Sequence, residues 1–413
     1  MAGSPSAVRS WFFSPSAADA RPAQPPRGGP DPRGWRTPPL RTLPLRDITL
    51  AWCATRIVTG AAYALARYIS GQLAAGHDAL HPTVATPFRL TGLLGWDAGW
   101  YAGIAEHGYA GVGGQGLRFF PLLPLLVRAV AVVPGLGGHT GGILLVLVNM
   151  IAFVFVAALA WLARSEGLDP AATSRVVWLA SLAPPAFVLV MGYTEALWGL
   201  LAVGVFAGLR TRRWELAAVC GLLAGLCRPV GILLVAPAAL EALRGLGTVA
   251  RTDRLRRAAA VLAPAAGFAL FGLWAQIAYG DALLPLRLQR QESLHGSSSN
   301  PAAVLWAAVR GIIHGQVGTG LHVPWLALSV VLLVVMARTL PASYTLWAAL
   351  TTAAVLTGSN LDSSERYVYG TFPYLFVAAG LTRRDDVLRI VLAVCAAMLV
   401  VYASLAFLGL YVP

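Results

Sequence analysis

The stretch TGGILLVLVNMIAFVFVAALAWLA, residues 140–163, contains no charged side chain, and its only hydroxyl and amide side chains are Thr140 and Asn149. A helix that crosses the hydrocarbon core of a bilayer needs about 20 predominantly apolar residues in succession. Residues 140–163 exceed that length. The stretch therefore predicts a membrane-spanning helix.

The rest of the chain repeats this pattern. Of its 413 residues, 57% are hydrophobic and only 12% are charged, whereas about a quarter of a soluble domain is charged. This composition excludes soluble, disordered, collagen-like and disulfide-scaffold proteins, because a globular surface needs polar cover. The sequence predicts an all-α, polytopic integral membrane protein with about eleven transmembrane helices. Besides 140–163, the apolar runs lie near 48–70, 173–192, 194–210, 214–228, 229–244, 258–279, 321–338, 341–358, 367–381 and 387–410.

A further apolar stretch, residues 119–134, contains three prolines and Arg128. We interpret it as helices at the outer membrane interface rather than as a span. With this assignment, the arginine clusters at 210–213, 244–257 and 383–384 all fall on one side of the membrane. Arginine-rich loops face the cytoplasm, so the sequence predicts a cytoplasmic N-terminus and an outer C-terminus.

The same pattern divides the chain into regions. Residues 1–45 are rich in Pro, Ser, Gly and Arg, which predicts a disordered cytoplasmic tail. Residues 46–413 form the predicted transmembrane domain. Its two long outer loops are 71–138, with interfacial helices, and 280–320. Long loops between helices are common sites of function.

The charged and sulfur-containing side chains exclude several chemistries. The formal net charge is +13, and all 31 basic residues are arginines. They are spread over the tail and short loops instead of forming one basic face, so a nucleic-acid partner is not expected. Without lysine there is no Schiff base and no P-loop lysine. The four cysteines have no metal-ligand or disulfide spacing, and we predict neither a metal nor a cofactor.

The first outer loop contains LGWDAGWYAGIAEHGY, residues 94–109. On a helix, Asp97, Trp100 and Tyr101 share one face because they lie at positions i, i+3 and i+4. Indoles and phenols favour the headgroup depth of a membrane. A partly desolvated carboxylate there would be a better base. The structural alternative is that Asp97 only caps the helix after Trp96.

Four motifs occur in a fixed order on the predicted outer side. They are W-D-A-x-W-Y-x-x-I-A-x-x-G-Y (96–109), FFPLLPLL (119–126), LAPPAFVLVMGYTEALW (182–198) and LAGLCRPVGILL (223–234), with weaker support from ERYVYGTFPYLF (365–376). This combination resembles the PIG-V family, the GPI mannosyltransferase 2-like enzymes within the GT-C glycosyltransferases.

The resemblance implies a GT-C multi-helix bundle in the cell membrane, of bacterial type, with an extracytoplasmic active site. It implies transfer of a mannosyl residue from a polyprenyl-phosphate-sugar donor to a lipid-linked or cell-envelope glycan acceptor, with inversion. The acidic residue that acts as base in the first outer loop matches Asp97. Partners would be the donor, the acceptor and membrane lipids.

The leaving phosphate in such a reaction needs fixed cations. In a chain without lysine, arginine must supply them, and the candidates at the outer boundary are Arg366, Arg228 and Arg118. Arginine in a spanning region usually has a partner or ligand. The structural alternative for Arg366 is an ion pair with Glu365 or Asp362. The alternative for Arg228 is that its side chain snorkels, extending its charged end to the membrane interface beside Pro229.

The remaining candidates are substrate contacts. Glu195 could hold a sugar hydroxyl or an arginine, although an acid at a helix N-terminus capped by Thr194 is an equal alternative. Members of the PIG-V family commonly carry a glutamine in the second outer loop, and Gln289 is the residue of this chain that matches it. The candidate substrate-binding residues are Trp96, Trp100, Tyr101, Glu195, Gln289 and Tyr367.

Two other functions fit a polytopic chain. Buried acids and arginines also mark the pathways of transporters and flippases, but transporters show two similar halves with interrupted helices, which we do not find. An inactive envelope-assembly protein could keep the motifs for packing alone. The charged residues gather at one predicted face, which favours an enzyme.

Overall fold

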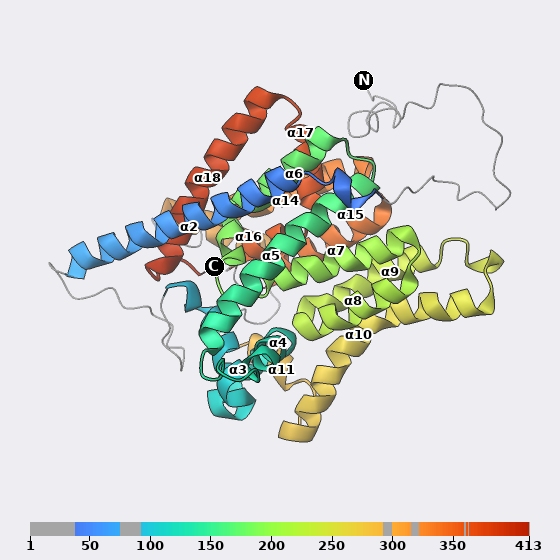
Figure 1. The fold of residues 1–413 in the computed structure, drawn as a ribbon, viewed down its shortest axis with the longest axis horizontal. Helices are drawn as coiled ribbons and strands as arrows, with labels where there is room; N and C mark the ends of the chain where they lie inside the picture. The colour runs from blue at the N-terminus through green and yellow to red at the C-terminus, as the bar shows by residue number, and fades with distance from the viewer. Residues whose placement is uncertain are drawn as a thin grey trace.

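The computed structural model describes residues 38–74, 92–291, 300–314, 322–358, 361 and 363–412. Within these residues every regular element is a helix (Figure 1). The structure thus confirms the all-α prediction. Residues 1–37 of the predicted tail and residues 75–91 of the first outer loop lie outside the described part of the chain.

The described residues form α-helices and 3₁₀ turns in the following order. The α-helices are α2 (Leu45–Ala74), α3 (Asp97–Val112), α4 (Leu122–Ala131), α5 (Thr140–Ser165), α6 (Pro170–Leu182), α7 (Glu195–Thr211), α8 (Trp214–Cys227), α9 (Val235–Ala242), α10 (Arg251–Tyr279), α11 (Leu284–Gln289), α12 (Pro301–Ile313), α14 (Val323–Thr339), α15 (Ala342–Leu356), α16 (Ser364–Tyr369), α17 (Pro373–Leu381) and α18 (Asp385–Phe407). The 3₁₀ turns are η1 (Leu40–Thr42), η2 (Gly92–Leu94), η3 (Gly114–Arg118), η4 (Pro184–Leu189), η5 (Pro229–Leu234) and η6 (Leu246–Thr248).

Four helices in the described residues are long and apolar enough to cross a membrane: α2, α5, α10 and α18. Residues 140–163 lie in α5, which has the highest mean hydropathy of the four helices. Helices α4, α8, α14 and α15 are also apolar but shorter. The total of about eleven spans therefore stays a prediction, as does the sidedness of the chain.

Prolines interrupt two of the predicted runs. The run 173–192 is not one helix: α6 ends at Leu182, and the chain continues as η4 from Pro184. The run 367–381 is likewise divided, because α16 ends at Tyr369 and α17 begins at Pro373. Proline lacks the amide hydrogen that an inner helical turn needs, so hydropathy alone overestimated the length of both helices.

The predicted outer loops contain helices. The first includes α3 and the ten-residue α4, which lie against each other and against α5. The second includes α11 and α12, which the sequence analysis did not predict. In Figure 1, α3, α4 and α11 gather at the lower end of the bundle, far from α6 and α17.

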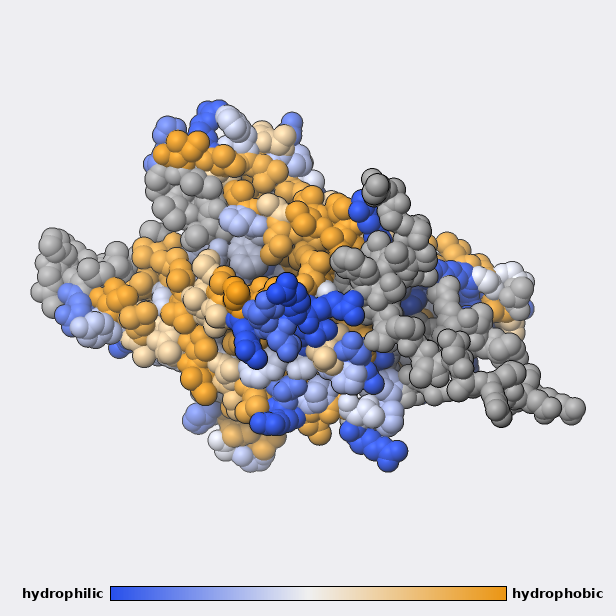
Figure 2. Space-filling view, turned by 90° about the horizontal axis from the view of Figure 1, so that it is seen from above, coloured by the Kyte–Doolittle hydropathy of each residue, from blue (hydrophilic) through white to orange (hydrophobic). Residues whose placement is uncertain are grey.

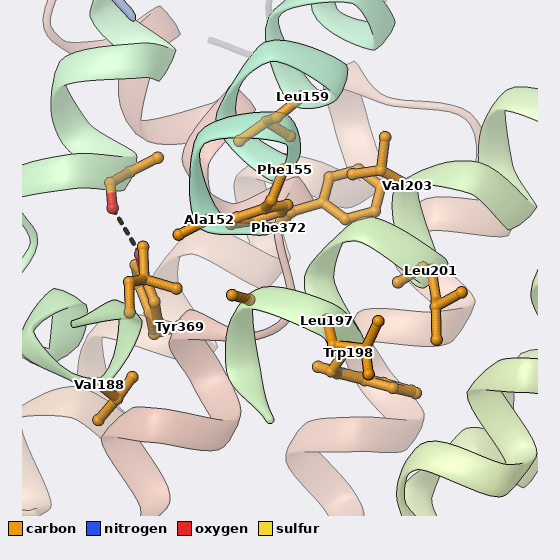
Figure 3. Packing of buried hydrophobic residues seen from close by; sticks show 14 of the residues in the cluster. Ala152, Phe155, Leu159, Val188, Leu197, Trp198, Leu201, Val203, Tyr369 and Phe372 are labelled. Atoms are coloured by element: carbon orange, nitrogen blue, oxygen red, sulfur yellow. Dashed lines mark hydrogen bonds between the residues drawn. The ribbon is translucent and has the colours of Figure 1, made fainter. Parts of the chain in front are cut away.

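The core lies where α5, α7 and the short helices around residue 370 meet. Phe155 of α5, Leu197 and Trp198 of α7, and Phe372 belong to one cluster of buried hydrophobic residues (Figure 3). The Tyr369 hydroxyl donates to the Ala180 carbonyl at 2.5 Å, which ties α16 to α6.

The outer surface of the bundle is largely apolar. Figure 2 shows wide hydrophobic areas to the left of and above a compact hydrophilic region. Many large apolar side chains of α2, α5, α10 and α18 are exposed. Such surfaces suit lipid contact.

Candidate functional site

The site is built around the first turn of α3. Trp96 precedes the helix with a φ of 55°, an uncommon conformation for a residue other than glycine. Its indole Nε1 donates to the Ala406 carbonyl of α18 at 2.9 Å, which fixes the chain where α3 begins. Asp97 is the first residue of the helix, and Trp96 occupies the cap position without a side-chain cap bond. Asp97 is therefore not the N-cap residue of α3.

Four ionised side chains form a chain of contacts across the bundle. Arg366 Nη1 donates to Asp97 Oδ2 at 2.6 Å, and Arg366 Nε lies 3.3 Å from Glu195 Oε1. The same Glu195 oxygen accepts from Arg228 Nη1 at 2.5 Å. We refer to Asp97, Arg366, Glu195 and Arg228 as the acid–arginine cluster.

The cluster joins four separate parts of the chain. Asp97 belongs to α3, Glu195 to the first turn of α7, Arg228 to the junction of α8 and η5, and Arg366 to α16. Its members also differ in exposure: 31% of the Asp97 side chain is exposed, but only 1% of the Glu195 side chain. The cluster therefore reaches the protein surface through Asp97.

These contacts bear on the alternatives considered for three residues. Arg366 pairs with Asp97 and Glu195, not with Glu365; Asp362 lies outside the described residues. Arg228 is buried and turned inward, so it does not snorkel. Glu195 holds two arginines.

Two tyrosine rings lie against the arginines. The Arg228 guanidinium carbon is 4.9 Å from the centroid of Tyr367, and that of Arg366 is 5.7 Å from the same ring. Arg366 is also 5.2 Å from the Tyr193 centroid. Ring faces attract cations, so both rings help to hold the guanidinium groups. Tyr193 was not among the predicted site residues, although it directly precedes Thr194 and Glu195 in the LAPPAFVLVMGYTEALW motif.

The other residues of the α3 face meet the segment after α3. The Trp100 ring stacks on Phe119, with centroids 5.5 Å apart, and the Arg118 guanidinium carbon lies 5.1 Å from Phe119 and 5.8 Å from Trp100. Tyr101 approaches the Phe119 ring edge-on, and its hydroxyl lies 3.3 Å from the Thr194 hydroxyl. Thr194 therefore joins α3 to α7, and it makes no side-chain cap bond to α7.

Arg118 differs from the arginines of the cluster. Its Nε donates to the Gln115 carbonyl at 3.2 Å, and no carboxylate in the described residues lies within ion-pair distance of it. Burial lowers the pKa of the Arg118 guanidinium, while the negative charge of Asp97 acts in the opposite direction. A partly buried cation without a carboxylate partner is suited to an external anion.

Gln289 contacts the backbone of Arg118. Its amide Nε2 donates to the Arg118 carbonyl at 3.2 Å, and Gln115 Nε2 donates to Gln291 Oε1 at 2.8 Å. These bonds attach α11 and its C-terminal end to η3. Gln289 therefore contacts the backbone that carries Arg118 rather than the acid–arginine cluster.

A second buried pair lies behind Arg366. Glu365 Oε2 is 2.6 Å from His322 Nδ1 at the start of α14, and both side chains are buried. His322 was not among the predicted site residues, because it lies at the start of the apolar run 321–338. The pair attaches α16 to the start of α14.

The arrangement defines a class of site rather than a particular activity. It offers one partly exposed carboxylate held by an arginine, and a separate cation beside it, all in an apolar helical bundle. No three His, Cys, Asp or Glu side chains in the described residues gather as metal ligands.

Comparisons with known proteins give a distant structural similarity. The chain is similar to two solved structures of the Archaeoglobus fulgidus oligosaccharyltransferase. The one in complex with Zn and sulfate has 15% sequence identity and a TM-score of 0.38, over 71% of this chain and 45% of that chain. The one tethered to an acceptor peptide with the NVT sequon has 13% identity and a TM-score of 0.39, over 86% and 55%.

This chain thus spans about half the length of the solved structures it matches. No protein-family model matches its sequence, and no curated protein does. The resemblance to the PIG-V family rests on the motifs alone.

Proposed function

We propose that the chain is an integral membrane glycosyltransferase of the GT-C type. It would transfer a sugar from a polyprenyl-phosphate donor to the hydroxyl of a lipid-linked or cell-envelope acceptor on the extracytoplasmic side. One observation carries this proposal. Arg366 holds the partly exposed Asp97 carboxylate, and Arg118, which has no carboxylate within ion-pair distance in the described residues, lies near enough to feel the charge of Asp97. The PIG-V-like motifs indicate mannose as the sugar.

The proposed mechanism divides the work between these groups. Arg366 binds Asp97 Oδ2 and so orients the carboxylate, which leaves Oδ1 for the acceptor hydroxyl. Asp97 takes the hydroxyl proton while the acceptor oxygen bonds to the anomeric carbon. The bond from that carbon to the phosphate oxygen breaks on the opposite face, and its electron pair leaves with the phosphate. The anomeric configuration is thereby inverted.

The leaving phosphate gains negative charge in this step, and fixed cations lower the cost of that charge. Arg118 is our first choice for direct contact, because Arg366 and Arg228 are already paired with carboxylates. Those two arginines would contribute positive electrostatic potential to the leaving phosphate without contacting it. In this account Trp100 and Tyr101 shape the wall between Asp97 and Arg118.

A transfer assay tests the proposal. Purified protein in proteoliposomes receives radiolabelled polyprenyl-phosphate-mannose and an extract of membrane lipids and glycans as acceptors. Asp97→Asn should reduce transfer roughly 10²- to 10⁴-fold, the usual contribution of a general base. Glu106→Gln is the matched control, since Glu106 is an exposed acid on the same helix and should transfer label at the normal rate.

Two results would contradict the proposal. One is full transfer by Asp97→Asn. The other is movement of the labelled lipid between leaflets, dependent on the intact chain, with no label in any acceptor; that result would favour a flippase.

A further inference from the structure

Helix α16 directs two neighbouring charged side chains to different partners. Arg366 binds Asp97 of α3, whereas Glu365 binds His322, the residue that precedes α14. Glu365 Oε2 lies 2.6 Å from His322 Nδ1, and both residues are only 2% exposed. We refer to Glu365 and His322 as the carboxylate–imidazole pair. The mechanism proposed above does not use this pair.

Helix α16 cannot hold its own orientation. It has only six residues, and a helix of that length is not stable by itself. The chain enters it at Ser363 with a φ of 61°, which few residues other than glycine adopt. Such a backbone conformation persists only where the surrounding structure holds it. The direction in which Arg366 leaves the helix therefore depends on contacts with other helices.

Two side-chain contacts flank Arg366 along α16. The carboxylate–imidazole pair lies one residue before it and attaches α16 to α14, which lies beside it (Figure 1). Three residues after it, the Tyr369 hydroxyl donates to the Ala180 carbonyl of α6. Contacts at both ends of so short a helix fix its rotation about its own axis. They thereby fix the direction of Arg366 toward Asp97.

Aromatic packing holds the imidazole in place. The His322 ring stacks on Tyr411, with centroids 5.3 Å apart, and Tyr411 lies 5.0 Å from Tyr402. The Tyr402 hydroxyl accepts from Trp325 Nε1 at 2.9 Å. His322 is therefore a fixed partner for Glu365.

The burial of the pair favours a role in geometry over a role in stability. A buried charged pair contributes little compared with apolar side chains of similar volume, because its desolvation is costly. It does restrict the two partners to one arrangement. A fixed arrangement is what the neighbouring Arg366 needs if it is to orient a carboxylate.

We propose that Glu365 and His322 are positioning residues for the base: they hold Arg366 in the direction in which it binds Asp97. This inference rests on the proposed function, since it assigns residues that act on Asp97 through Arg366. It extends the catalytic arrangement to α14, which contributes no member of the acid–arginine cluster.

Steady-state kinetics test the positioning role. Glu365→Ala should lower kcat roughly 10- to 10²-fold, as for a slight misplacement of a catalytic group, and leave the donor KM unchanged. His322→Ala should have the same effect. Glu365→Gln should recover most of the loss, because its amide oxygen can still accept from His322. In an Arg366→Gln background, Glu365→Ala should cause no further loss, because the two residues act through one contact.

Carbodiimide labelling of Asp97 gives a readout that needs no sugar transfer. Dicyclohexylcarbodiimide reacts with protonated carboxyl groups, and a bound guanidinium favours the charged carboxylate. With purified protein in nanodiscs and mass spectrometry, labelling of Asp97 should rise several-fold in Glu365→Ala and in His322→Ala. Glu241→Ala is the matched control. It removes another buried acid, which pairs with Arg210 instead of Arg366, and should leave the labelling of Asp97 unchanged.

Three results would overturn the inference. The first is native kcat in Glu365→Ala and His322→Ala. The second is a further loss of kcat when Glu365→Ala is added to Arg366→Gln, and the third is equal labelling of Asp97 in Glu365→Ala and Glu241→Ala. The last two would show that the pair supports the fold alone. A native chain that transfers no sugar would refute the proposed function instead, and the labelling would still decide whether the pair positions Arg366.

Discussion

Glu195 shows how a single residue sets the charge balance of the site. It is almost fully buried and receives two guanidinium groups on one oxygen, while its other oxygen has no partner in the described residues. Two buried arginines without it would leave Asp97 as their sole counter-charge. Removing one member of a buried ion pair is far more costly than replacing the whole pair.

The first prediction concerns the stability of this pairing. Glu195→Gln should lower the free energy of unfolding by about 3 kcal/mol or more, because Arg228 loses its counter-ion. Denaturation by SDS in mixed micelles measures the change. Asp386→Asn is the control, since its ion pair with Arg384 is exposed; it should leave stability unchanged. Equal effects of the two variants would show that the cluster is not a buried network.

The second prediction separates the two kinds of arginine. Arg118→Gln should raise the KM for the donor roughly tenfold with little change in stability, because within the described residues the Arg118 side chain makes one hydrogen bond, to a backbone carbonyl. Arg366→Gln should instead lower kcat, because Asp97 loses the group that orients it. Steady-state kinetics with varied donor concentration distinguish the two effects. A lower kcat in Arg118→Gln together with a higher donor KM in Arg366→Gln would contradict this prediction and exchange the roles of the two arginines.

Among the helices, the closest contact is between α8 and α10. A Cβ atom on Gly225 would lie 2.1 Å from the Pro264 carbonyl oxygen, and one on Gly267 would lie 2.0 Å from the Leu222 carbonyl oxygen. Only glycine permits this approach, a common feature of helix pairs in membranes. The end of α8 leads into Arg228, so this contact also positions one arginine of the cluster.

The third prediction tests that contact. Gly225→Ala should destabilise the protein by about 1–3 kcal/mol or more, because α8 and α10 must separate to admit the methyl group. Gly60→Ala in α2 is the matched control. A methyl group there meets nothing within 4 Å, and alanine is the better helix former by about 1 kcal/mol. Thermal aggregation of the detergent-solubilised protein ranks the variants, and a neutral Gly225→Ala would be evidence against the close approach.

At the scale of elements, hydropathy predicted which segments are helices better than it predicted where they end or how they pack. The runs that became α5 and α18 contain no proline, and α10 continues as a helix through Pro264. The run 367–381 merged α16 with α17, because the proline at the start of α17 was not weighed. Asp97 could be singled out from its aromatic neighbours. Its pairing with Arg366 could not, since the two lie 269 residues apart and a hydropathy pattern does not fix how helices rotate against one another.

Across the whole molecule, buried charges gather at two ends of α7. Glu195 begins the helix, and Arg210 near its end is 2.7 Å from Glu166 and 3.4 Å from Glu241. No charged residue lies between them on α7. They are separated by about 22 Å along the helix axis.

The fourth prediction is the sidedness of the chain. In a variant without native cysteines, Glu106→Cys should react with a membrane-impermeant maleimide applied to intact cells. Arg212→Cys should react only after permeabilisation. Both positions are exposed in the structure, so burial does not explain a missing signal. Labelling of both positions from the same side would contradict the predicted placement of these two loops on opposite sides of the membrane.

The most direct measurement is a single-turnover experiment that follows donor binding and sugar transfer in the same sample. For Asp97→Asn, the account predicts donor affinity close to that of the native chain and a chemical step slowed roughly 10²- to 10⁴-fold. An unchanged chemical step would contradict the role of Asp97 as the base. Loss of donor binding with an unchanged transfer rate at saturation would likewise assign Asp97 to the donor site and not to the reaction.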